Sequence, residues 1–129
     1  MTPDRFADGD PANDAGVDRQ NPGAWHGGDL KGLSGRLDYV KALGATALWM
    51  TPVYRQVGPV NGTAGDHGYW PADFRSIDPH FGRLSDFTAL NAKAHTLGLK
   101  VMLDQVINHY SNEAAAQTAH PAARCRTRR

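Results

Sequence analysis

The fold class of this chain is decided by one stretch of sequence, Leu84-Ser-Asp-Phe-Thr-Ala-Leu-Asn-Ala-Lys-Ala-His-Thr-Leu-Gly-Leu-Lys-Val-Met-Leu-Asp-Gln-Val-Ile-Asn108. Its first half predicts an amphipathic helix, with Ser85 as the N-cap and Gly98 as the left-handed stop. Directly after that stop, residues 99–107 are apolar enough to predict a strand buried on both faces. The apolar members of the helical stripe are Phe87, Leu90, Ala94 and Leu97.

A second copy of this plan lies upstream, between Leu30 and Val53. Gly44 again supplies the helix stop, and residues 46–53 are the second apolar run. Helices alternating with buried strands indicate parallel α/β architecture, although the pattern alone leaves open an unrelated α+β domain. The helical stripe of this copy comprises Leu30, Leu33, Leu37, Val40 and Leu43.

The segment from Tyr54 to Arg83 separates the two copies and is rich in glycine, proline and polar residues. Connections in compact domains are usually a handful of residues long, and a loop of this length is commonly functional. It follows the carboxyl end of a predicted strand, which is where α/β barrels place their binding loops. We therefore expect a long binding loop here.

Length and composition limit what the rest of the chain can be. A chain of 129 residues has room for one domain, and 40% hydrophobic with 21% charged residues is typical of globular proteins. A net charge of +1 gives no argument for a nucleic-acid or membrane partner, and a single cysteine excludes an internal disulfide. The N-terminus carries no export signal as written. From residue 111 the sequence becomes alanine-rich and then arginine-rich, so we expect a disordered tail over residues 111–129.

Three polar residues leave the end of the second predicted strand together: Asp104, Asn108 and His109. Polar groups at that place point into the mouth of a parallel sheet. The alternative is that Asp104 and Asn108 cap a turn while His109 is a solvated loop residue.

The central segment carries a run suited to a carbohydrate, Asp66-His67-Gly68-Tyr69-Trp70. Aromatic rings stack on the apolar face of a sugar, and histidine can bond its hydroxyl groups. His67 and Tyr69 are therefore candidate ligand contacts, whereas Trp70 and Phe74 suit the packing of a long loop equally well.

The N-terminal segment gathers oxygen donors in a loop that contains glycine and proline. Hard cations such as Ca²⁺ take six to eight oxygen ligands of this kind. The spacing is not that of an EF-hand, and loops rich in Asp and Asn also form turns without any metal. The donors are Asp4, Asp8, Asp10, Asn13 and Asp14.

Taken together, these blocks resemble the α-amylase family of glycoside hydrolases (family 13), and are nearest in character to its neopullulanase and cyclodextrin-processing members. The resemblance covers residues 1–110 and implies the N-terminal part of a TIM (β/α)8 barrel that acts on α-linked glucans. The matching blocks, in the family's order, are Pro3–Asp10, Gly27–Leu33, His67–Trp70, Asp73-Phe74, Asp78–Gly82 and Asp104–His109.

The resemblance also implies roles for single residues. His67, Tyr69 and His109 match residues that line the sugar subsite where cleavage occurs, and Asp104 matches an aspartate that supports neighbouring groups. Asn108 matches a ligand of the family's common Ca²⁺ site. A second Ca²⁺ site, found in neopullulanase-like members, corresponds to Asp8, Asp10, Asn13, Asp14, Gly27 and Asp29.

By this resemblance the parent protein cleaves α-1,4-glucosidic bonds in an α-glucan or maltooligosaccharide by a retaining mechanism. That mechanism needs two carboxyl groups, which the family carries on barrel strands four and five. This chain holds material for two complete strands, so we expect no catalytic residue in it and no hydrolysis by the chain alone.

Two alternatives remain at this point: a sugar-binding barrel relative without catalysis, and a gene remnant without function. The abrupt change at residue 111 is also what a shifted reading frame produces. A secreted or periplasmic parent suits the family, but the sequence leaves the location open. It also leaves open which glucan is used and whether hydrolysis or transfer dominates.

Overall fold

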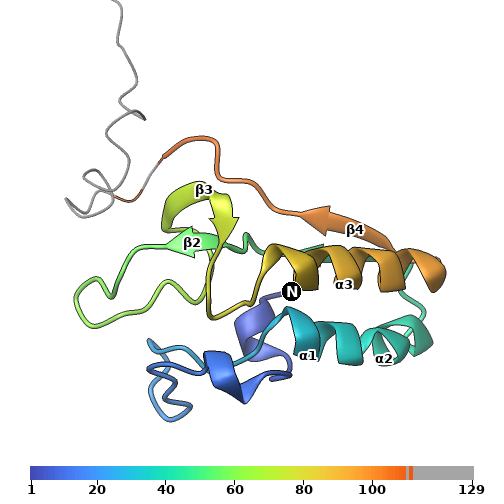
Figure 1. Ribbon diagram of the computed structural model, residues 1–129, viewed down its shortest axis with the longest axis horizontal. Helices are drawn as coiled ribbons and strands as arrows, with labels where there is room; N and C mark the ends of the chain where they lie inside the picture. Colours follow the sequence, from blue (N-terminus) through green and yellow to red (C-terminus); the bar gives the residue numbers. More distant parts are fainter. Residues whose placement is uncertain (110, 112–129) are drawn as a thin grey trace, which may run out of the picture.

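The computed structural model describes residues 1–109 and Ser111, which form two small sheets and a set of short helices (Figure 1). The predicted tail lies outside the described residues apart from Ser111. Within the described part, no helix has the length and apolar character needed to cross a membrane. The elements in chain order are η1 (Pro3–Arg5), η2 (Pro11–Asn13), α1 (Leu30–Gly35), α2 (Leu37–Ala42), β1 (Ala47–Met50), β2 (Tyr54–Gln56), β3 (Pro71–Ile77), α3 (Leu84–Thr96) and β4 (Lys100–Leu103).

The two apolar runs form a parallel pair of strands, as the repeated plan predicts. β1 pairs with β4 in parallel, with Leu48 opposite Val101, and the chain between them passes through α3. Gly44 and Gly98 end the preceding helices with φ values of 83° and 70°, which confirms both predicted left-handed stops. The chain is therefore built on parallel α/β architecture.

The start of the chain lies beside β1. The terminal amine of Met1 donates to the Trp49 carbonyl oxygen at 2.8 Å, and the Thr51 amide donates to the Met1 oxygen at 3.0 Å. Met1 therefore lies along the edge of β1 that is not paired with β4.

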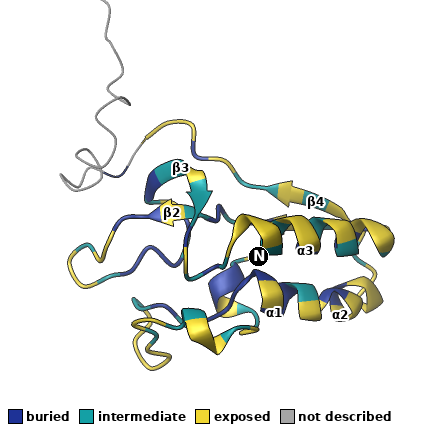
Figure 2. Cartoon of the chain, viewed as in Figure 1, coloured by how far each residue is buried: buried dark blue, intermediate teal, exposed yellow. Residues whose placement is uncertain are grey.

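The predicted burial of the strands on both faces is wrong. Trp49 and Met102 face each other across the β1–β4 pair, yet they are 61% and 48% exposed. Leu48 and Met50 are buried in the core with Leu90 of α3. The helices cover one face of this sheet, and the other face is open (Figure 2).

Two details of the helices also differ from the prediction. The first helix divides at Arg36, which ends α1 and begins α2, and Leu43 falls beyond α2 and is 67% exposed. The N-cap of α3 is Arg83 rather than Ser85, because the Asp86 carboxylate accepts a hydrogen bond from the Arg83 backbone amide at 2.8 Å.

The central segment is more ordered than the expected long loop. β2 and β3 form an antiparallel pair, with Tyr54 opposite Ile77, and irregularities interrupt their register. The buried Asp78 carboxylate follows β3 and accepts from the Gln56 amide of β2 at 2.8 Å. This small sheet fixes both ends of the loop that carries residues 57–70.

Candidate functional site

The four candidate sugar-contacting residues lie together in one cluster. The Tyr69 hydroxyl donates to Asp104 Oδ2 at 2.6 Å, and His109 Nε2 donates to the Tyr69 carbonyl oxygen at 3.0 Å. The His67 ring stacks against the Tyr69 ring, with centroids 5.9 Å apart, and meets Trp70 edge-on at 4.7 Å. The structure thus brings His67, Tyr69, Asp104 and His109 to one place.

Backbone geometry explains how Tyr69 reaches the end of β4. The Asp104 amide donates to the Met50 oxygen at 2.9 Å, so Asp104 continues the parallel ladder just past β4. Gly68 has a φ of 87°, and a methyl group placed on it would lie 2.0 Å from the Pro52 oxygen. Only glycine permits this approach, which holds the loop against the segment after β1.

Neighbouring groups shift the pKa values of two side chains of the cluster, Tyr69 and His67. The hydrogen bond to Asp104, with a smaller effect of burial, raises the pKa of Tyr69, so its hydroxyl stays a donor. Burial lowers the pKa of His67, although Asp66 opposes this, so its ring is neutral at pH 7. Because His67 Nδ1 accepts from the Tyr69 amide at 2.9 Å, the proton lies on Nε2 and is available to a ligand.

A second group of polar atoms lies in the N-terminal segment, before α1. Asn13 Nδ2 donates to Asp29 Oδ2 at 3.0 Å, and Asp29 Oδ1 caps α1 by accepting from the Gly32 amide at 2.6 Å. Asn13 Oδ1 and Asp14 Oδ1 are buried, and neither has a hydrogen-bond partner within the described residues. A methyl group on Gly27, whose φ is 86°, would lie 2.7 Å from that Asp14 oxygen.

These unpartnered oxygens fit a cation. A buried oxygen without a donor is costly unless an ion or water satisfies it. Burial and the Asp8 carboxylate raise the pKa of Asp14 despite the opposing charge of Arg19, which shows that negative charge is crowded here. Among the described residues, no three His, Cys, Asp or Glu side chains are placed to hold a metal, so amide and backbone oxygens would have to complete the shell.

The other predicted metal ligands are placed differently. Asp8 is paired with Arg19 at 2.7 Å, and Asp10 is paired with Lys31 at 2.5 Å. Asn108 is exposed and follows β4, and the segment after β4 runs along the opposite side of the molecule from η1 and η2 (Figure 1). Asn108 therefore does not belong to the N-terminal group.

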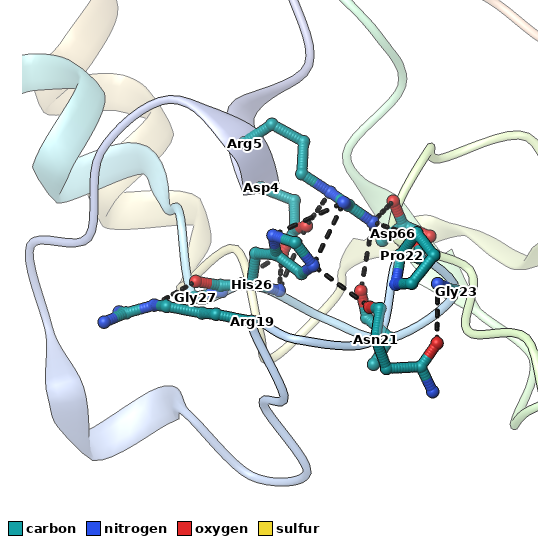
Figure 3. Close-up of polar contacts among 10 residues, drawn as sticks. Asp4, Arg5, Arg19, Asn21, Pro22, Gly23, His26, Gly27 and Asp66 are labelled. Carbon is teal, nitrogen blue, oxygen red and sulfur yellow. Dashed lines mark hydrogen bonds and ion pairs between the residues drawn. The ribbon is translucent and has the colours of Figure 1, made fainter.

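Asp4 and Arg5 form a network that the sequence reasoning missed (Figure 3). The sequence predicts Asp4 to be a metal donor, but its carboxylate accepts from the His26 and Gly27 amides and pairs with Arg5 Nε at 2.8 Å. Arg5 Nη2 also pairs with the buried Asp66 at 2.7 Å, directly before His67. The only signal in the sequence was the adjacent Asp-Arg pair, which does not reveal its distant partners.

His80 links three segments beside this network. Its Nδ1 lies 2.8 Å from Asp78 Oδ1, its Nε2 lies 2.8 Å from the Ala15 carbonyl oxygen, and its ring stacks on Trp25 at 4.1 Å. Burial opposes the charge on His80, but the Asp78 hydrogen bond, the Ala15 carbonyl and the charges of Asp78 and Asp4 outweigh it and raise the pKa of His80. Both ring nitrogens meet acceptors, so the charged ring is the form that satisfies them.

The raised pKa of His80 gives stability a pH dependence. The stabilisation that charged His80 contributes is fully present below the pKa of the unfolded state, about 6.5. It is lost as the pH rises through the pKa of the folded state. We expect His80→Gln to destabilise the chain more at about pH 6 than at about pH 8.5, in urea titrations followed by tryptophan fluorescence. His95→Gln, at an exposed histidine of α3, is the matched control. A penalty for His80→Gln that is the same at both pH values would contradict this role.

Comparison with known proteins assigns the chain to a family. It matches the family model for the alpha amylase catalytic domain over residues 1–126. An alpha-amylase of Streptomyces lividans is 48% identical over 99 residues, covering 73% of this chain and 11% of that protein. A cyclomaltodextrin glucanotransferase of Klebsiella oxytoca is 44% identical, covering 82% and 18%. Neopullulanase 2 of Thermoactinomyces vulgaris is 41% identical, covering 86% and 19%.

Solved structures agree with this assignment. The crystal structure of an Anoxybacillus alpha-amylase matches with a TM-score of 0.82 and 42% identity over 93% of this chain and 26% of that one. The alpha-amylase of Geobacillus thermoleovorans, solved with acarbose, matches with a TM-score of 0.75 and 40% identity over 88% and 23%. The chain spans less than a fifth of the three sequence relatives and about a quarter of these structures. It belongs to the α-amylase family of glycoside hydrolases (family 13), as a part of the catalytic domain.

Proposed function

We propose that this chain forms part of the sugar-contacting rim of a (β/α)8 barrel that cleaves α-1,4-glucosidic bonds with retention of configuration. The observation that carries the proposal is the Tyr69–Asp104 hydrogen bond, at 2.6 Å, just past the carboxyl end of β4. Active sites of such barrels lie at that end of their strands. The acarbose complex of the Geobacillus thermoleovorans relative supports an α-glucan or maltooligosaccharide as the ligand class.

Each residue of the cluster has a distinct task in this proposal. Tyr69, which is 36% exposed, offers a ring face on which a sugar ring stacks. His67 Nε2 and the His109 ring approach sugar hydroxyl groups, and Asp104 holds the Tyr69 hydroxyl in place. A retaining reaction needs two carboxyl groups about 5 Å apart, and Asp104 alone cannot both attack the anomeric carbon and protonate the leaving oxygen. The chemistry is therefore assigned to carboxylates on barrel strands outside this chain.

The same proposal includes Ca²⁺ in the N-terminal segment. Asn13 Oδ1 and Asp14 Oδ1, which have no partner within the described residues, would bind the ion together with the Gly27 carbonyl and Asp29. Asp8 and Asp10 would join them once released from their ion pairs. Held by these residues, Ca²⁺ would supply positive charge to the crowded carboxylates and would stabilise the folded form of the segment before α1. Asn108 is proposed as a ligand of a different Ca²⁺ site, completed by residues outside this chain.

Binding of maltotriose tests the proposed rim. We expect maltotriose to broaden or shift NMR signals of Tyr69 and His67 at millimolar concentration, and to yield no glucose or maltose. Tyr69→Phe keeps the stacking ring but removes the hydrogen bond by which Asp104 holds Tyr69 in place, and should weaken binding by up to about fivefold. Tyr39→Phe, at an exposed tyrosine of α2, makes the same change elsewhere and should bind as the wild type does.

Two results would count against the rim. Equal binding by the Tyr69→Phe and Tyr39→Phe variants would show that the Tyr69 hydroxyl and its hydrogen bond to Asp104 play no part in binding. Turnover of maltotriose by the chain, abolished in Asp104→Ala, would show that Asp104 is catalytic and would contradict the assignment of catalysis to residues outside this chain.

A further inference from the structure

The guanidinium group of Arg19 lies at the exposed edge of the N-terminal oxygen cluster, which we define as Asp8, Asn13, Asp14 and Asp29. Its Nη2 donates to Asp8 Oδ2 at 2.7 Å, and its Nε donates to the His26 carbonyl oxygen at 2.9 Å. Figure 3 shows the Arg19 side chain running along the backbone of His26 and Gly27. A methyl group on Gly27 would meet Arg19 Nη2 at 3.2 Å and Asp14 Oδ1 at 2.7 Å, so the guanidinium and the unpartnered carboxylate oxygen crowd the same α-carbon.

We propose that Arg19 is an internal counter-cation that competes with Ca²⁺ for this cluster. This inference rests on the Ca²⁺ site proposed above. A divalent ion bound by Asn13 and Asp14 meets the positive charge of Arg19 close by, and like charges repel. The same contact occupies Asp8, a further carboxylate that the ion would use. Arg19 therefore acts on the ion twice, by repulsion and by holding a ligand.

The structure allows Arg19 to leave the cluster. Its side chain is 60% exposed and that of Asp8 is 25% exposed, and ion pairs in contact with solvent are weak. Arg19 and Asp8 also line a cavity of about 390 Å³ that gives the guanidinium room to move. Ca²⁺ binding thus exchanges one cation for another, and Arg19 sets the calcium concentration at which the exchange occurs.

Calorimetric titration of the 129-residue chain with Ca²⁺ tests the proposal. We expect Arg19→Gln to bind Ca²⁺ about fivefold more tightly than the wild type, because the ion no longer has to displace the solvent-exposed Arg19–Asp8 ion pair. Arg19→Lys keeps the positive charge and should restore affinity toward the wild-type value. Arg36→Gln removes the same charge at the exposed junction of α1 and α2, and should leave the affinity unchanged.

Thermal stability, measured without and with Ca²⁺, is a second readout. Without Ca²⁺, Arg19→Gln leaves the carboxylates uncompensated, so its thermal midpoint should fall below that of Arg36→Gln, and added Ca²⁺ should restore it. Binding by Arg19→Gln but not by the wild type would also support the competition.

The titrations distinguish a failure of the proposed Arg19 role from a failure of the proposed Ca²⁺ site. Equal affinities of the wild type and Arg19→Gln would overturn the role of Arg19 and leave the Ca²⁺ site standing. Absence of binding in both would overturn the site, and the competition with it. Asp14→Asn in the Arg19→Gln background should abolish the tight binding, and retention of that binding would place the ion elsewhere and overturn the proposal.

Discussion

Replacing Gly32 with alanine is expected to abolish cooperative folding of the chain. Gly32 lies in α1, where alanine would ordinarily stabilise the helix by about 1 kcal/mol. Here a methyl group would lie 2.0 Å from the Ala7 oxygen and 2.5 Å from the Ala7 carbonyl carbon. Both are backbone atoms that no rotamer change can move, so the N-terminal segment would have to separate from α1.

That separation breaks more than one contact. The Ala7 oxygen accepts from the Asp29 amide at 3.0 Å, and the Asp4 oxygen accepts from the Gly28 amide at 2.9 Å. Overpacking of a well-packed site usually costs about 1–3 kcal/mol, and the loss of these hydrogen bonds adds to it. The total is a large part of the 5–15 kcal/mol that stabilises typical domains.

Gly35 provides a matched control in the same helix. A methyl group on Gly35 has no atom within 4 Å, so Gly35→Ala should be neutral or stabilising by about 0.5–1 kcal/mol. Far-UV circular dichroism during urea titration measures both variants. Cooperative unfolding of Gly32→Ala with a midpoint near that of Gly35→Ala would show that the close approach of α1 to residues 7–8 is not required.

Features that depend on local spacing could be predicted from the sequence. The helical stripes put Leu33 and Leu90 in the core, where both are fully buried. Leu43 follows the same spacing but is exposed, because α2 ends at Ala42. The open face of the β1–β4 pair could not be predicted, because the apolar character of a residue such as Trp49 does not show whether another element covers its side chain.

Long-range pairs mark the limit of sequence reasoning for the site. Tyr69 and Asp104 were each predicted to lie near the sugar, but their hydrogen bond joins residues 35 positions apart. The Arg5–Asp66 ion pair spans 61 positions, and neither residue has a local pattern that indicates the other. The β2–β3 pair could not be predicted either, because register shifts interrupt the regular alternation of apolar and polar residues that indicates a strand.

Asp4→Ala is expected to destabilise the chain by about 3 kcal/mol, the lower end of the cost of breaking a buried ion pair. Asp4 is 2% exposed. Its Oδ1 accepts from the His26 amide at 2.9 Å and the Gly27 amide at 3.2 Å, while its Oδ2 pairs with Arg5. Alanine would leave two donors and a guanidinium group without this acceptor, and partly buried groups in that state carry a desolvation cost.

The exposure of Arg5 limits the charge contribution to this effect. Its side chain is 31% exposed, so water can solvate part of the guanidinium once Asp4 is gone. Burial, the largest influence, raises the pKa of Asp4 although His26 and Arg5 oppose it, so the negative charge is itself costly. Asp4→Asn should therefore lie between the wild type and Asp4→Ala, because its amide oxygen can still accept from the two backbone amides.

Asp38→Ala is the control that separates this network from an ordinary surface pair. Asp38 pairs with Lys93 at 3.4 Å, but its side chain is 70% exposed, and the change should alter stability by less than about 0.5 kcal/mol. The urea midpoints of Asp4→Ala, Asp4→Asn and Asp38→Ala measure how much the Asp4 network contributes to stability. If Asp4→Ala unfolds at the same urea concentration as Asp38→Ala, the His26–Gly27 segment is held by its other contacts. If Asp4→Asn is as unstable as Asp4→Ala, charge rather than hydrogen bonding is what joins Asp4 to Arg5 and to this segment.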